Sequence, residues 1–167
     1  MNINKLRLKD RKKYLTVSLK NANDNLLDFI ASQLNFGVDI IEINGDNLNA
    51  KTVMEQVKII RELCSIYNAL LIIYDRADIA LAVEADGVVI NSNGIPVDKT
   101  RELIGHNMIL GFYAENGNNF ELPCHIDYVI SNHQNNEYKN LNDVPFFIAD
   151  KGNENSLAVK YYEKIQD

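Results

Sequence analysis

The chain has 167 residues, 46% of them hydrophobic and 24% charged, and its 17 basic and 23 acidic residues give a net charge of −6. This composition predicts one globular domain over residues 1–167, and the acidic balance argues against general nucleic-acid binding. We expect no membrane span, because no apolar run is long enough, and no signal peptide. Cys64 and Cys124 lack a C-x-x-C partner, so neither a zinc site nor a disulfide is expected, and a cytoplasmic location fits.

Strand-like and helix-like segments alternate along the chain. Residues 4–8 alternate weakly between polar and apolar side chains, which predicts a short edge strand. Strands are then predicted in chain order at residues 14–19, 38–43, 69–74, 87–90, 108–112, 127–131 and 146–149. Helices are predicted between them at about residues 26–34, 50–67, 78–84 and 96–104, with a closing helix at 155–165.

This order of elements predicts an α/β fold with a parallel sheet. The run at residues 69–74 is almost continuously apolar, which is typical of a parallel strand buried on both faces. Periodicity alone does not distinguish an open doubly wound sheet from a closed barrel. Cys64 shares helical spacing with Val57 and Ile60, so it is expected to pack in the core.

Residues 70–88 read L-L-I-I-Y-D-R-A-D-I-A-L-A-V-E-A-D-G-V. This stretch resembles the thiamin phosphate synthase/TenI family, which has a strand ending in I-N-D-R followed by V-D-x-A-L-A-x-x-x-A-D-G-V. Residues 101–105, 109–111 and 127–129 resemble the family's R-x-x-x-G, I-I-G and D-Y-V segments, so the likeness covers about residues 14–132. The resemblance implies a TIM-like (β/α) barrel.

The positions that bind phosphate in the family differ in this chain. The family motif Q-x-R-E-K reads Glu42-Ile43-Asn44-Gly45-Asp46 here, so the two cations that would neutralise a pyrophosphate leaving group are absent. The family's G-x-S-x-H reads G-F-Y-A-E at residues 111–115. Its T-x-T-K segment has no counterpart, with Lys139 at best a displaced substitute. Its I-G-G phosphate loop reads I-A-D at 148–150, without the glycines that admit a phosphate to the backbone.

Magnesium is the cofactor that the resemblance implies. Asp75 matches one of the family's two magnesium ligands, whereas Gly94 stands at the position of the second. Mg²⁺ is usually held by carboxylates together with substrate phosphates, so a single carboxylate predicts a weak site. Asp75 could instead cap the helix expected near Asp78, and Arg76 could pair with Asp78 or Asp86 on the surface.

Any remaining site is expected at the carboxyl ends of the strands, where barrel enzymes bind their substrates. Whether the Glu42 side chain points inward depends on strand register. His133 matches a histidine that serves acid–base chemistry in TenI-type thiazole tautomerases, although a solvated loop histidine is the alternative. Six residues follow strands and are predicted to converge at this end: Glu42, Asn44, Asp75, Asn91, Tyr113 and His133.

A complete barrel has eight strand–helix units and about 200 residues or more. Only seven strands are predicted from Tyr14 onward, so a shortened or incomplete barrel is expected. An open edge would need cover, either from residues 4–8 or from the partner of a homodimer.

Two functions remain open on this basis. The family likeness favours an enzyme of thiamin biosynthesis, either a thiamin phosphate synthase or a thiazole tautomerase. The substituted motif positions favour a non-catalytic barrel that binds a small heterocycle or a protein partner. The acidic, amide-rich rim, for which Lys151 is the one candidate cation, suits a neutral or cationic molecule better than a phosphate.

Overall fold

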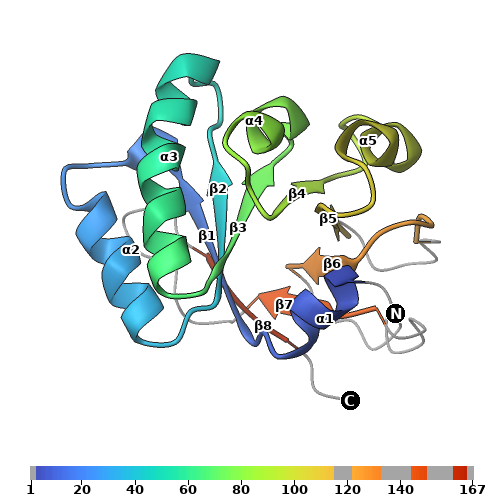
Figure 1. The fold of residues 1–167 in the computed structure, drawn as a ribbon, viewed down its shortest axis with the longest axis horizontal. Coiled ribbons are helices and arrows are strands. Elements are labelled where there is room, and N and C mark those ends of the chain that lie inside the picture. The colour runs from blue at the N-terminus through green and yellow to red at the C-terminus, as the bar shows by residue number, and fades with distance from the viewer. Residues whose placement is uncertain (1–2, 115–121, 133–143, 150–159, 165–167) are drawn as a thin grey trace.

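The computed structural model describes residues 3–114, 122–132, 144–149 and 160–164. Eight strands form one closed barrel in which each strand pairs with the next in the chain and β8 pairs back to β1 (Figure 1). Strands β1 to β7 are mutually parallel, and β8 is antiparallel to both of its neighbours. The strands are β1 Lys13–Ser18, β2 Ile40–Asn44, β3 Leu70–Tyr74, β4 Gly87–Ile90, β5 Ile109–Tyr113, β6 Tyr128–Ser131, β7 Phe146–Ala149 and β8 Lys160–Lys164. The expected TIM-like barrel is confirmed, and an open doubly wound sheet is excluded.

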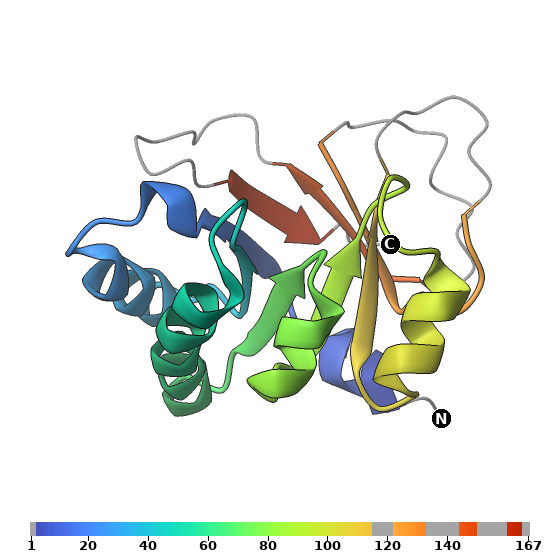
Figure 2. The same cartoon turned by 90° about the horizontal axis from the view of Figure 1, so that it is seen from above.

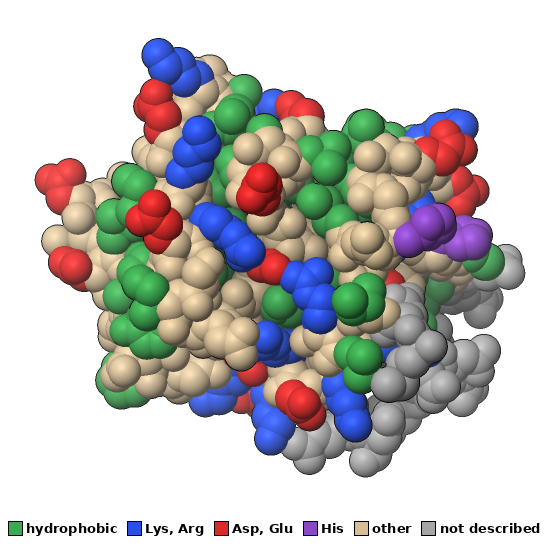
Figure 3. Space-filling model, viewed as in Figure 1, with side chains coloured by type: hydrophobic (Ala, Val, Ile, Leu, Met, Phe, Trp, Pro, Cys, Tyr) green, Lys and Arg blue, Asp and Glu red, His purple; other side chains and the backbone are tan. Residues whose placement is uncertain are grey.

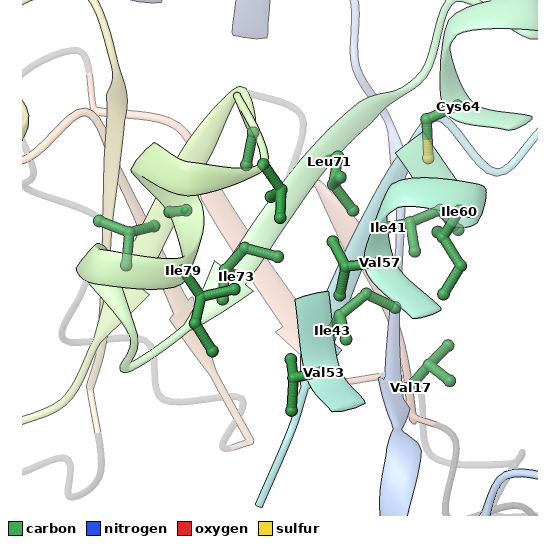
Figure 4. Packing of buried hydrophobic residues seen from close by; sticks show 14 of the residues in the cluster. Val17, Ile41, Ile43, Val53, Val57, Ile60, Cys64, Leu71, Ile73 and Ile79 are labelled. Atoms are coloured by element: carbon green, nitrogen blue, oxygen red, sulfur yellow. The ribbon is translucent and has the colours of Figure 1, made fainter. Parts of the chain in front are cut away.

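Helices cover the outside of the barrel along β1 to β5. They are α2 Leu26–Asn35, α3 Ala50–Ile66, α4 Ala77–Ala82 and α5 Val97–Ile104, with a 3₁₀ turn, η1, at Leu19–Asn21. Helix α3 buries Val53, Val57, Ile60 and Cys64 at i, i+4, i+7 and i+11, one face of a 3.6-residue period. In Figure 4 this face packs against Ile41 and Ile43 of β2 and Leu71 and Ile73 of β3. Cys64 is therefore core, as expected.

Residues 4–8 do not form the predicted edge strand. They belong to helix α1, Ile3–Lys9, which lies at the amino ends of the strands, on the side away from the β3 and β4 arrowheads (Figure 2). Asn4 and Leu8 share one helix face at i and i+4, and both are fully buried. Leu8 joins the apolar cluster inside the barrel. The sequence did not indicate a helix here because only these two side chains of the segment are buried, too few to show a helical period.

The predicted closing helix at residues 155–165 is also wrong where the structure describes it. Residues 160–164 form β8, which pairs with β1 on one side and β7 on the other. This strand satisfies backbone groups on two edges that would otherwise be exposed, and it points Tyr162 into the barrel core. The barrel thus has an eighth strand and no open edge, which removes the reason for a homodimer partner at that place.

An aspartate stands immediately before each of three alternate strands and ties it to the strand before. Asp39 accepts hydrogen bonds from the backbone N–H groups of Lys12 and Lys13, at 2.9 and 3.0 Å. Asp86 accepts from Leu71 N at 2.8 Å, and Asp127 accepts from Leu110 N at 2.9 Å. The sequence pattern is V-D-I, A-D-G and I-D-Y at residues 38–40, 85–87 and 126–128.

Two of these aspartates also bind side chains of α1 and so connect this helix to the barrel. Asp86 pairs with Arg7 of α1 and with Arg61 of α3. Asp127 accepts from the Asn4 amide at 3.0 Å and from Arg101 of α5 at 2.8 Å. Asp86 therefore connects α1 and α3 to the barrel, and its partners are Arg7 and Arg61 and not the Arg76 suggested by the sequence.

Gly111 gives room to a ring in the barrel core. A Cβ at this position would lie 2.5 Å from the Tyr128 hydroxyl oxygen, inside contact distance. Tyr128 is fully buried among other rings, so it has little freedom to move aside. We expect Gly111→Ala to destabilise the fold by about 1–3 kcal/mol through overpacking, measured by urea unfolding. Gly105→Ala is unsuitable as a control because Gly105 has φ +71°, whereas Leu103→Ala alters an exposed side chain and should change little.

Candidate functional site

Glu42 is the buried acidic side chain inside the barrel. It lies in the middle of β2, opposite Thr16 of β1, and only 2% of it is exposed. Its Oε2 accepts hydrogen bonds from the hydroxyls of Tyr14, at 2.6 Å, and Tyr113, at 3.0 Å. The Tyr14 hydroxyl in turn lies 2.9 Å from that of Tyr128. The strand register therefore points Glu42 inward, and it binds a set of tyrosine hydroxyls from three other strands.

The environment of Glu42 favours its protonated form more than water does. Burial raises the pKa of this carboxyl from 4.5 to about 7, although the hydrogen bonds from Tyr14 and Tyr113 oppose that rise. Burial, followed by the charge of Glu42, raises the pKa of Tyr14, Tyr113 and Tyr128 well above 10. These tyrosines stay protonated, so Glu42 is the member of the network that titrates near neutral pH.

Three further tyrosine contacts connect this network to the carboxyl ends of the strands, which we call the mouth. Tyr74 and Tyr113 are half-buried and pack edge to face with ring centroids 5.7 Å apart. Tyr113 and Tyr162 also pack edge to face, at 6.4 Å. Asn91 donates a hydrogen bond to the Tyr74 hydroxyl. The rings thus lead from the solvent-facing mouth to the buried carboxyl.

The structure brings together three of the six residues predicted at the mouth. Glu42 and Tyr113 are in direct contact, and Asn91 reaches Tyr113 through Tyr74. Asn44 instead accepts the backbone N–H of Asp46 through its own side chain, at 2.8 Å. His133 lies outside the described residues.

Asp75 sits on the rim rather than in the network. It is exposed, has a left-handed backbone with φ 52°, and donates a hydrogen bond from its backbone N–H to Val89 O. Its carboxyl does not cap α4, whose N-cap Arg76 makes no capping side-chain bond. The carboxyl reaches instead to the loop after β4, where a Cβ built on Gly94 would lie 3.3 Å from its Cγ.

These residues do not fit a magnesium ion. In the described part of the chain, no three His, Cys, Asp or Glu side chains group together as a metal site would need. The Asp75 carboxyl lies against Gly94, a residue that has no side chain to supply a second carboxylate. Since Mg²⁺ prefers near-octahedral oxygen ligation, one exposed carboxylate gives it little to bind.

The carboxyl ends of β1 to β6 carry no Lys or Arg, whereas Lys160 begins β8 beside β1 at this end of the barrel. The residues that end β1 to β6 or directly follow them are Ser18, Leu19, Asn44, Gly45, Tyr74, Asp75, Ile90, Asn91, Tyr113, Ala114, Ser131 and Asn132. Arg76, one residue further on, pairs with Asp78 at 2.6 Å. Exposed lysines gather instead around α1 and the start of β1, at the opposite end of the barrel: Figure 3 looks onto that end and shows basic side chains there.

Sequence analysis missed Tyr14, Tyr128 and Tyr162 as members of the site. Side chains alternate along a strand, so an inward Glu42 implies an inward Thr16 opposite it, and hence Tyr14 two residues earlier. That alternation was a usable signal for Tyr14. Tyr162 was not predicted because the sequence favoured a helix over residues 155–165.

The comparisons with known proteins agree with the fold. The family profile described as thiamine monophosphate synthase matches residues 14–129. A thiamine-phosphate synthase of Fusobacterium nucleatum is 36% identical over 112 residues, which are 65% of this chain and 53% of that protein. Thiamine-phosphate synthase 1 of Aquifex aeolicus is 35% identical over 121 residues, 70% of this chain and 55% of that protein.

A solved structure, a thiamine phosphate pyrophosphorylase from Pyrococcus furiosus, superposes with a TM-score of 0.62 at 25% identity. The match covers 77% of this chain and 62% of that one. The chain spans about half the length of the two relatives above. No helix among the described residues is long and apolar enough to cross a membrane. With the profile matching more than half of its length, the chain belongs to the thiamine monophosphate synthase family.

Proposed function

We propose that this barrel binds an unphosphorylated heterocycle, of the aminopyrimidine type, at its mouth and does not carry out thiamin phosphate synthesis. The observation that carries the proposal is the chemistry of the mouth, which combines tyrosine rings, amides and carboxyls without a Lys or Arg at the carboxyl ends of β1 to β6.

The proposal follows from what pyrophosphate displacement requires. Charge that develops on the leaving group must be met by preorganised cations or metal ions, and removing one such stabilising group costs about 10²–10³ in rate. Here Asp75 adds an exposed carboxyl to the rim, and the nearby Arg76 is held by Asp78 through two hydrogen bonds, of 2.9 and 2.6 Å. A heterocycle without phosphates would meet aromatic surface and hydrogen-bonding groups instead.

Isothermal titration calorimetry on the whole chain tests this proposal with three probes: pyrophosphate with Mg²⁺, inorganic phosphate, and 4-amino-5-hydroxymethyl-2-methylpyrimidine. We expect the pyrimidine alone to give saturable heat, and Asp75→Asn to weaken it. Glu55→Gln on the exposed face of α3 is the matched control and should leave it unchanged. Pyrophosphate binding that Asp75→Asn alters, with no pyrimidine binding, would contradict the proposal.

The register places Lys160 of β8 opposite Thr16 of β1, toward the mouth end of β1. Lys160→Gln is therefore a second control for anion binding. If pyrophosphate binds and this variant removes the binding, the mouth has a cation that replaces the missing family motif, and the proposal is wrong.

Gly94→Asp should give the chain a magnesium site that it lacks. The new side chain would stand against the Asp75 carboxyl, and two adjacent carboxylates repel each other unless a cation lies between them. We expect at least a tenfold gain in Mg²⁺ affinity over the wild type, measured by calorimetry. The gain should disappear in Gly94→Asp combined with Asp75→Asn, and Gly94→Asn should not reproduce it. Equal Mg²⁺ binding by the wild type and Gly94→Asp would show that the site is already formed.

A further inference from the structure

Asp127 and Glu42 are the two most buried carboxylates among the described residues, and they differ in whether an ion pair compensates their charge. Asp127 pairs with Arg101 at 2.8 Å, and the less buried Asp86 pairs with two arginines. Glu42 makes no ion pair with any side chain that the structure describes, and it accepts hydrogen bonds from the hydroxyls of Tyr14 and Tyr113. A buried charge is normally paired, because an unpaired one is costly.

The described polar side chains linked to Glu42 are uncharged. Tyr14 and Tyr113 donate to it, Tyr128 reaches it through Tyr14, and Tyr162 packs against Tyr113. Thr16 lies opposite Glu42 in the register. Lys160, two residues before Tyr162 on β8, lies opposite Thr16 by register. It is the basic position to be tested against a ligand cation.

Three tyrosine rings near this carboxyl, those of Tyr74, Tyr113 and Tyr162, pack edge to face. Tyr74 and Tyr113 meet at 79° and Tyr113 and Tyr162 at 74°, so the three rings present faces in different directions. An organic cation is attracted to the face of a tyrosine ring, more strongly when it is desolvated. Tyr74 and Tyr113 are the half-buried rings of this set, so a ligand from solvent would meet them first.

From this arrangement we propose that the mouth selects an organic cation, an ammonium or amidinium group on an aromatic or apolar ring, whose positive charge is met by Glu42 and by the faces of Tyr74, Tyr113 and Tyr162. This inference rests on the proposed function and adds the charge of the ligand. To reach the carboxyl, the N–H group of the cation replaces the Tyr113 hydroxyl as a hydrogen-bond donor to Glu42. Binding stabilises ionised Glu42, so below about pH 7 it releases a proton from that carboxyl.

Benzylamine and benzyl alcohol test the charge directly, because they differ little in shape and the first is cationic. We expect benzylamine to bind the whole chain at least tenfold more tightly than benzyl alcohol. Its affinity should rise about tenfold from pH 6 to pH 8 as Glu42 ionises. Glu42→Gln should abolish both the preference and the pH dependence, while Glu55→Gln should keep both.

A second measurement does not depend on any variant. The ¹³C carboxyl resonance of Glu42 should titrate near pH 7 in the free protein, and saturating benzylamine should move that midpoint to lower pH. An unmoved midpoint, or equal binding of the two probes, overturns the cation inference. If 4-amino-5-hydroxymethyl-2-methylpyrimidine still binds in that case, the proposed function stands without it. If Lys160→Gln raises both the benzylamine affinity and the pKa of Glu42, the lysine and not a ligand compensates this charge, and the inference is also overturned.

Discussion

Glu42→Gln should make the protein more stable relative to the wild type as pH rises. Burial raises the pKa of Glu42 from 4.5 to about 7, so the folded state holds this proton more tightly than the unfolded chain. The resulting stability is present in full below pH 4.5 and is lost as pH rises through 7. The shift corresponds to about 3 kcal/mol over that window. Urea unfolding of both proteins from pH 4.5 to 8.5 measures the difference.

The difference between the two proteins isolates Glu42, because other titrating groups contribute equally to both. Tyr14→Phe removes the shorter hydrogen bond to the carboxyl and should push the Glu42 pKa higher still. The contradicting result is a difference in unfolding free energy between the wild type and Glu42→Gln that does not change across this pH range. It would show that the pKa of Glu42 is the same in the folded and unfolded states.

Asp127→Ala should cost about 3–5 kcal/mol of folding free energy, the usual penalty for removing one partner of a buried ion pair. It leaves the buried Arg101 guanidinium without its carboxylate and the Leu110 N–H without its acceptor. It also removes the contact that holds Asn4 of α1. Thermal or urea unfolding measures the loss.

Asp39→Ala is the matched control for Asp127→Ala. Asp39 has the same position before its strand and the same hydrogen bonds to the preceding strand, but it is half-buried and has no described ion pair. We expect a loss of about 1 kcal/mol, typical of hydrogen bonds without a buried charge. Equal losses at the two positions would mean that the backbone bonds, and not the Arg101 pair, carry the effect.

The strands β1 to β7 were predictable because each is a short apolar run with β-branched residues between turn signals, as at Leu70–Tyr74. The two terminal segments were not. Only Asn4 and Leu8 of α1 are buried, too few to establish a helical period. Residues 160–164 form a strand because the edges of β1 and β7 need a partner, a requirement that arises from distant parts of the chain and is not expressed in local propensity.

The candidate site was predictable to the extent that it follows from strand ends. Glu42, Asn91 and Tyr113 meet because parallel strands bring their carboxyl ends to the same place. The expectation that residues 44–46 lack the family's two basic residues also came from the sequence. The ring of tyrosines was not, because Tyr14 and Tyr128 come from the layer below and converge on Glu42 only once the barrel closes.

The central claim is that this chain keeps the barrel of its family but not the charges that pyrophosphate displacement needs. A turnover assay with the purified chain, Mg²⁺, hydroxymethylpyrimidine diphosphate and thiazole phosphate tests it most directly. Enzymes commonly turn over at about 10 s⁻¹, and the loss of two or more charge-stabilising groups at about 10²–10³ each predicts a rate below about 10⁻³ s⁻¹. Thiamin phosphate formed at about 1 s⁻¹ or faster would contradict the account.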